Sequence, residues 1–224
     1  MKYMLVFEST LVIHIIAGSL AILFGLLAMS VVKGSKRHIR FGTIFWYTMW
    51  GMAGSGIILA AMRDRPVFVL ISILSIYLIA TGRNALTRPK GAVDRKVWFW
   101  FTVVIVCGLA GVALGWWGMT SRDHNLGDPA PLFFGVAFDA FIFAVLDWRL
   151  IRRGHARGQR RLIDHLWRMI AAILFALFAL FVANPQLFPP WFNETGLNFL
   201  PSLAMLCLII YWILAVRRGS AIAS

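Results

Sequence analysis

Seven long apolar runs, each bounded by a short cluster of charge, constrain most strongly how this chain can fold. The runs hold 17 to 25 residues, and a helix needs about 20 apolar residues to cross the hydrocarbon core of a bilayer. Only 14% of the residues are charged and 60% are hydrophobic, whereas a soluble domain carries about 25% charged residues. The pattern predicts an all-α bundle of transmembrane helices that forms a single integral membrane domain over residues 1–224. The seven expected helices are 9–32, 41–62, 66–82, 97–121, 129–150, 165–184 and 196–216.

The positions of lysine and arginine predict which side of the membrane each loop occupies. Of the 22 residues of these two types, 18 fall in and around the loops after the first, third and fifth helices or in the C-terminal tail, and 4 fall on the other side. Short loops that are rich in lysine and arginine stay in the cytoplasm. We therefore expect the N-terminus outside and the C-terminus in the cytoplasm.

The net charge of +13 follows mostly from this bias and from the attraction of basic loops to anionic lipid headgroups. It does not indicate a nucleic-acid partner, because proteins of that class present their basic surface on a soluble scaffold. The expected partners are membrane lipids, with a membrane-protein partner or a homo-oligomer left open. Gly108, Gly111 and Gly115 share one face of the fourth helix, a spacing that favours close helix packing. We expect this face to pack within the bundle rather than against a second copy.

Several kinds of active site are excluded by the motifs that the sequence lacks. It contains no P-loop, no dinucleotide-binding glycine motif, no HExxH zinc-protease motif and no GxSxG nucleophile motif. Cys107 and Cys207 both fall inside apolar runs, so neither a disulfide framework nor a thiolate metal site is predicted. His124 and His155 fall in loops and are expected to be solvated. Whether the chain is an enzyme is left open by these observations.

Ionisable residues at membrane depth form a first candidate site. A charge inside the bilayer is costly, so each such residue is a functional hypothesis. His14 lies in the first helix and Asp139 near the middle of the fifth, while Glu8 and Asn184 lie near the same outer boundary. If the first, fifth and sixth helices meet, these four residues form a polar site for a proton or a small ligand.

A second candidate site lies where helices reach the cytoplasmic rim. His38 begins the second helix, Arg83 ends the third and His165 begins the sixth, with Asp164 expected as its N-cap. Asp147 and Arg168 lie about one turn inside the same edge, and we expect them to form an ion pair. His38 and His165 match in depth, so they are the expected iron ligands if a haem is bound.

Short motifs along the chain resemble a bacterial family of multi-pass membrane proteins of unknown function. They are a His-x-x-x-Gly motif at 14–18, an Arg-His-x-x-x-Gly motif at 37–42, the run 75–86 in the third helix and a His-x-x-Arg-Met motif at 165–169, with Asn-Pro at 184–185 downstream. The resemblance implies a multi-pass protein of the bacterial cytoplasmic (inner) membrane. It supports the choice of His14, His38, His165 and Arg168 and adds Tyr77 to the rim site, but it implies no reaction.

Two classes of function remain open on the sequence alone. The first is a non-catalytic protein, such as a transporter, sensor or assembly factor, that handles a proton or a small ligand at a polar intramembrane site. The second is a redox protein that holds haem b between histidines. No inverted repeat or broken helix is evident, which argues against the usual transporter designs. No helix carries two histidines spaced across the bilayer, which argues against a familiar two-haem cytochrome.

Overall fold

A computed structural model of the chain describes residues 2–87, 93–121, 127–154, 158–182 and 184–218. Within these ranges the regular structure consists of α-helices and short 3-10 turns, without a strand. Seven of the helices are long and apolar enough to cross a membrane. The predicted all-α fold of a multi-pass membrane protein is therefore confirmed. The side on which each terminus lies stays a prediction, and His124 and His155 lie outside the described residues.

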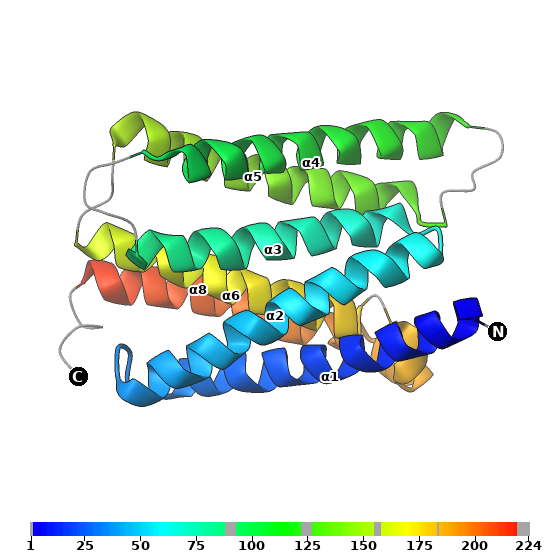
Figure 1. Cartoon of the computed structure of the whole chain (residues 1–224), viewed down its shortest axis with the longest axis horizontal. Coiled ribbons are helices and arrows are strands. Elements are labelled where there is room, and N and C mark those ends of the chain that lie inside the picture. The colour runs from blue at the N-terminus through cyan, green and yellow to red at the C-terminus, as the bar shows by residue number, and fades with distance from the viewer. Residues whose placement is uncertain (1, 88–92, 122–126, 155–157, 183, 219–224) are drawn as a thin grey trace. The chain divides into compact units, whose positions relative to one another are not determined.

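The long helices follow the order of the apolar runs (Figure 1). They are α1 (Lys2–Ser30), α2 (Lys36–Met62), α3 (Pro66–Thr87), α4 (Arg95–Thr120), α5 (Ala130–Arg153), α6 (Gln159–Phe181) and α8 (Leu200–Arg217). The connection from α6 to α8 contains the 3-10 turn η1 (Pro185–Leu187), the short helix α7 (Pro190–Glu194) and the 3-10 turn η2 (Leu197–Phe199). The seventh span, Leu197–Arg217, consists of η2 and α8.

Several helices continue past the ends of their apolar runs. The helix α1 begins at Lys2, α3 continues to Thr87 and α6 begins at Gln159, so the boundaries expected at 9, 82 and 165 are wrong. The reason is that lysine, arginine and glutamine are good helix formers, and a helix does not end where the hydrocarbon ends. Asp164 consequently lies inside α6 and is not its N-cap.

In the described part of the chain, α2 and α4 are each capped by a side chain just before the helix. Ser35 precedes α2, and its Oγ accepts a hydrogen bond from the backbone N–H of His38 at 3.1 Å. Asp94 precedes α4, and its Oδ1 accepts from the backbone N–H of Val97 at 3.1 Å. Such caps satisfy donors that a first helical turn leaves unpaired. The Ser35 cap also fixes the backbone from which the His38 side chain projects.

The chain divides into two compact units. The first unit comprises Met1–Ile15, Trp50–Tyr77 and Arg88–Arg157, and the second comprises Ile16–Met49, Leu78–Thr87 and Gly158–Ser224. Each of the helices α1, α2 and α3 is therefore divided, with one segment in the first unit and the other in the second. The polar residues of the candidate sites are also divided between the units.

In the first unit, α4 and α5 lie side by side (Figure 1). Their close approach depends on the glycine face of α4. A Cβ atom on Gly111 would lie 3.0 Å from the backbone oxygen of Phe133 and 3.1 Å from Cβ of Ala137. A Cβ atom on Gly108 would lie 2.9 Å from the ring of Phe141, and one on Gly115 would lie 3.0 Å from the ring of Phe134. The prediction that these glycines serve packing within the protein is confirmed.

A buried carboxylate joins two loops of the first unit. Asp128, which precedes α5, forms an ion pair with Arg65. Its Oδ2 atom also accepts a hydrogen bond from the backbone N–H of Val67, at 3.3 Å. Because Pro66 supplies no N–H, Val67 carries the first free donor of α3. Asp128 therefore caps α3 from a distant loop, a role that sequence spacing could not predict.

In the second unit, α6 packs against α8, and its buried face is largely apolar. Gly25 of α1 allows a close approach in this unit. A Cβ atom at Gly25 would lie 2.8 Å from Cδ1 of Ile173 and 3.1 Å from the ring of Phe45. This packing places segments of α1, α2 and α6 together beside the polar residues described next.

Candidate functional site

One face of α6 is docked on the C-terminal end of α3 in the second unit. Arg161 donates from Nε to the backbone oxygen of Ala85 at 3.0 Å. One turn further along α6, Nδ1 of His165 lies 2.9 Å from the backbone oxygen of Gly82. Residues spaced three and four apart share a helix face, so Arg161, His165 and Arg168 all point toward this end of α3.

Gly82 makes that docking possible. A Cβ atom at this position would lie 3.1 Å from Cβ of Arg168 and 3.2 Å from Cε of Met169. The two chain segments that carry the family resemblance in the third and sixth helices therefore touch each other here. Sequence analysis did not single out Gly82 as a site residue, although it is part of the run 75–86 that carries the resemblance.

His38 is tied to the main chain in the same way as His165. Its Nδ1 atom lies 2.9 Å from the backbone oxygen of Ala28, which belongs to the last turn of α1. The last four carbonyls of a helix have no partner within the helix, so the imidazole satisfies one of them. The contact joins the end of α1 to the start of α2.

These bonds fix the chemical state of both rings. A carbonyl oxygen only accepts, so Nδ1 of His38 and of His165 must carry the proton, and in a neutral ring Nε2 is then a bare acceptor. Among the residues that the structure describes, neither Nε2 atom has a hydrogen-bond partner. His165 is also within range of a direct electrostatic interaction with His38 and Arg168. We call His38, Arg83, His165 and Arg168 the histidine cluster.

Arg83 and Trp46 link α3 to α2 within the same unit. The indole Nε1 of Trp46 donates to the backbone oxygen of Ile79 at 3.2 Å. The guanidinium carbon of Arg83 lies 4.5 Å from the centre of the Trp46 ring system, a cation–π distance. Arg83 is thus held against α2, one residue after Gly82, whose carbonyl binds His165.

Arg168 is the most deeply buried charge of the cluster, with 1% of its surface exposed. Its guanidinium NH1 donates to the backbone oxygen of Asp164 at 3.1 Å and lies 3.5 Å from the Asp164 carboxylate. The guanidinium also lies over the ring of Trp167, at 4.4 Å. Asp164 therefore acts as a partner of Arg168 one turn away.

Lys33 adds a partly desolvated charge in the turn between α1 and α2. Its ammonium donates to the backbone oxygens of Met29 and Val31 and lies 4.5 Å from the centre of the Trp212 ring system. Burial lowers the pKa of the Lys33 ammonium, because the charged form loses hydration. The side chain thus ties this turn to α8.

Tyr77 and Asp147, two of the predicted rim residues, meet in the first unit. The Tyr77 hydroxyl donates to Oδ2 of Asp147 at 2.7 Å, and the two residues are 0% and 2% exposed. The Tyr77 ring stacks on Phe143 with its centroid 5.9 Å away. Because Arg168 belongs to the second unit, the expected ion pair between Asp147 and Arg168 stays a prediction.

His14 of α1 is bound to α2 in the first unit. Its Nδ1 atom lies 2.9 Å from the backbone oxygen of Met52 and 3.1 Å from Oγ of Ser55. Ser55 was not predicted as a site residue, and serine in an apolar helix gives no sequence signal that separates this role from simple packing. As in the histidine cluster, the carbonyl contact assigns the proton to Nδ1.

The other residues of the expected outer site lie in different surroundings. Asp139 is half-buried on α5, and among the described residues no hydrogen bond or ion pair joins it to His14. Glu8 is exposed. Asn184 follows α6 and donates to the backbone oxygen of Ala179 at 2.6 Å. A common ligand of these four residues stays a prediction.

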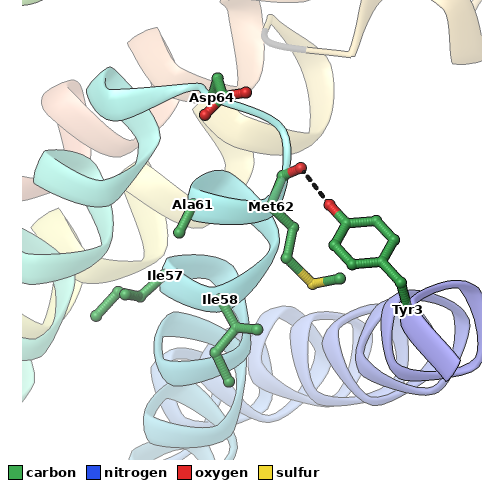
Figure 2. Close-up of a pocket in the computed structure, with 6 residues that line it drawn as sticks. All are labelled: Tyr3, Ile57, Ile58, Ala61, Met62 and Asp64. Atoms are coloured by element: carbon green, nitrogen blue, oxygen red, sulfur yellow. Dashed lines mark hydrogen bonds between the residues drawn. The ribbon is translucent and has the colours of Figure 1, made fainter.

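A surface groove of about 540 Å³ lies between α1 and α2 in the first unit (Figure 2). Its lining residues are Tyr3, Ile57, Ile58, Ala61, Met62 and Asp64. Figure 2 shows the Tyr3 hydroxyl reaching across to the backbone oxygen of Met62, at 2.8 Å. The lining is mainly apolar and contains none of the predicted site residues, so the groove is not the candidate site.

Metal binding by side chains alone is not supported in the described ranges, which contain no group of three or more His, Cys, Asp or Glu residues that could hold a metal ion. Comparisons of the chain with models of protein families, with curated proteins and with solved structures gave no match. The candidate function therefore depends on the geometry of the site itself.

Proposed function

We propose that this chain is a bacterial inner-membrane protein that binds a proton or a small polar ligand in the histidine cluster. The observation that carries the proposal is the shared state of His38 and His165. Both rings give Nδ1–H to a main-chain carbonyl, and both keep Nε2 as an acceptor. Because the sequence contains no P-loop, HExxH or GxSxG motif, we favour binding over covalent chemistry on a substrate.

The surroundings favour some ligands over others. Arg83 and Arg168 bring positive charge to the cluster, and a bare divalent cation is disfavoured beside them. A proton on Nε2, or a hydroxyl group or an anion that contacts the imidazoles and the guanidinium groups, suits the same donors and acceptors. Ionisable groups of this kind inside a membrane protein are typical of sites that handle protons or bind polar ligands.

The test is a pH titration followed by nitrogen NMR of histidine-labelled protein in lipid nanodiscs. We expect His38 and His165 to be Nδ1–H tautomers with Nε2 as a bare acceptor, and protons bound by the cluster should appear on Nε2. The His38→Gln variant should remove one of the two imidazole signals and keep that of His165.

The matched control is His14→Gln, which removes an imidazole of the first unit and should leave the signals of His38 and His165 in place. Rings that never carry a proton on Nε2 during the titration would show that the two histidines only tie helices together. A folded His38→Gln protein, judged by its circular dichroism, is required for the comparison. His165→Gln provides the reciprocal measurement.

Haem b is a second candidate ligand, and the same carbonyl contacts favour it. Metal-binding histidines commonly donate their other ring nitrogen to a backbone carbonyl, and neutral imidazoles are iron ligands of b-type haem. His38 and His165 would hold the iron, and the arginines would suit the haem carboxylates. A bound haem would supply one-electron redox chemistry.

The absorption spectrum of protein purified after haem-replete expression tests this second candidate. We expect a Soret band that shifts, and α and β bands that sharpen, when dithionite reduces the iron. The His38→Gln and His165→Gln variants should lose these bands, whereas His14→Gln should keep them. A colourless wild-type protein would reject haem as the ligand and leave the proton-binding proposal unaffected.

A further inference from the structure

The surface groove between α1 and α2 (Figure 2) has an apolar floor. This floor is one face of the last two turns of α2, because its residues are spaced three and four apart; they are Ile57, Ile58, Ala61 and Met62. The helix α2 ends at Met62 and is long and apolar enough to span a membrane. The floor therefore extends about 8 Å back from the end of a membrane-spanning helix, where acyl chains surround the protein.

The groove also has a polar edge, where α2 ends. Tyr3 lines this edge from the first turn of α1, and its hydroxyl donates to the backbone oxygen of Met62. Figure 2 shows Asp64 in the turn beyond α2, two residues after the helix ends. The groove is open to its surroundings, because 48% of Ile58 and 64% of Tyr3 are exposed. An apolar surface that leads to a polar edge matches an amphiphilic ligand.

The charge at this edge is negative. Asp64 is the charged residue of the lining, and within the described ranges its carboxylate has no ion pair or hydrogen bond. The two arginines that flank it in the chain are held by other groups. The guanidinium carbon of Arg63 lies 4.7 Å from the centre of the Phe7 ring on α1. Arg65 forms its ion pair with Asp128. The groove therefore offers its ligand a carboxylate that no cation of the described residues neutralises.

We propose that this groove binds a phospholipid whose headgroup carries a primary ammonium, such as phosphatidylethanolamine. An acyl chain lies on the apolar floor, and the ammonium donates to the Asp64 carboxylate in a charge-assisted hydrogen bond. The quaternary ammonium of phosphatidylcholine has no N–H to donate, and the anionic headgroup of phosphatidylglycerol is repelled by the carboxylate. All six lining residues belong to the first unit, so this site is independent of the histidine cluster.

Native mass spectrometry of delipidated, full-length protein in detergent tests the proposal. The protein is titrated with phosphatidylethanolamine, phosphatidylcholine and phosphatidylglycerol that carry the same acyl chains. We expect the first bound lipid to be held most tightly when its headgroup is ethanolamine. Asp64→Asn should weaken that binding by about two- to fivefold, the effect of one exposed ion pair, and remove the headgroup preference. Asparagine, like aspartate, tolerates the φ of 50° at this position.

Glu8→Gln is the matched control for charge, because Glu8 is an exposed carboxylate of α1 outside the lining; this variant should keep the wild-type affinities. Ala61→Phe places a ring in the groove and should weaken the binding of all three lipids. Its control is Val12→Phe, at a position of α1 that is 55% exposed and outside the lining.

Equal affinities for the three headgroups in wild type would overturn the proposal. An Asp64→Asn protein that binds lipids as Glu8→Gln does, or an Ala61→Phe protein that binds them as Val12→Phe does, would also overturn it. If Ala61→Phe does not fold, the comparison of Asp64→Asn with Glu8→Gln decides alone.

Discussion

Replacing Gly111 with leucine is expected to separate α4 from α5 and to prevent stable packing of the first unit. The Cβ atom of any residue here would meet backbone atoms, with Phe133 O at 3.0 Å and Ala137 N at 3.3 Å, and backbone cannot move aside as a side chain can. Overpacking by a few methylenes costs about 1–3 kcal/mol. We expect Gly111→Ala to lower the free energy of unfolding by about 1–2 kcal/mol, the lower part of that range, and Gly111→Leu to lower it further.

Unfolding in mixed micelles at increasing SDS fraction, followed by tryptophan fluorescence, measures this effect. Gly135 is the matched control, because it lies on α5 and a Cβ atom there would meet nothing within 4 Å. Gly135→Ala should be neutral or stabilising, since alanine favours a helix over glycine by about 1 kcal/mol. Equal losses of stability at the two positions would contradict the packing described for Gly111.

Tyr77→Phe is expected to destabilise the protein by removing one donor from the buried Asp147. The substitution keeps the ring that packs on Phe143 and deletes only the hydroxyl at 2.7 Å from the carboxylate. A buried acceptor that loses a partner costs about 1–3 kcal/mol, and we expect a loss of that size. The same unfolding titration measures it.

The matched control is Tyr47→Phe, because Tyr47 is 63% exposed and its hydroxyl makes no hydrogen bond within the described residues. This variant should change stability by less than about 0.5 kcal/mol. A double-mutant cycle of Tyr77→Phe with Asp147→Asn should show a coupling of about 0.5–3 kcal/mol, as residues in contact do. Strict additivity would mean that the hydroxyl and the carboxylate do not support each other.

The helices could be predicted from the sequence because each one needs a long apolar run, which composition reveals directly. Even the run at 66–82, the shortest of the seven, is a helix that continues to Thr87. The helix ends were harder to predict, since lysine, arginine and glutamine prolong a helix beyond the apolar part. Asp164 shows the consequence, because it lies one turn inside α6 instead of capping it.

The candidate site was only partly predictable, because depth along a helix does not determine the direction in which a side chain points. His14 and Asp139 were grouped by depth, but the partners of His14 are Met52 and Ser55 on α2. The partners of all three membrane histidines include backbone carbonyls, which every residue carries and no sequence pattern reveals. Gly82 matters through the side chain that it lacks, and only the packed neighbours expose that role.

The carbonyl contacts of His38 and His165 also restrict how these rings could take part in proton movement. An imidazole that conducts protons must accept at one nitrogen and release from the other, or rotate between two partners. Here Nδ1 of His38 donates to the backbone oxygen of Ala28, and Nδ1 of His165 donates to that of Gly82. Each ring can therefore exchange a proton only at Nε2. A proton that enters there must leave by the same atom unless a tie between helices breaks. The rings are thus suited to binding a proton reversibly rather than to conducting protons across the membrane.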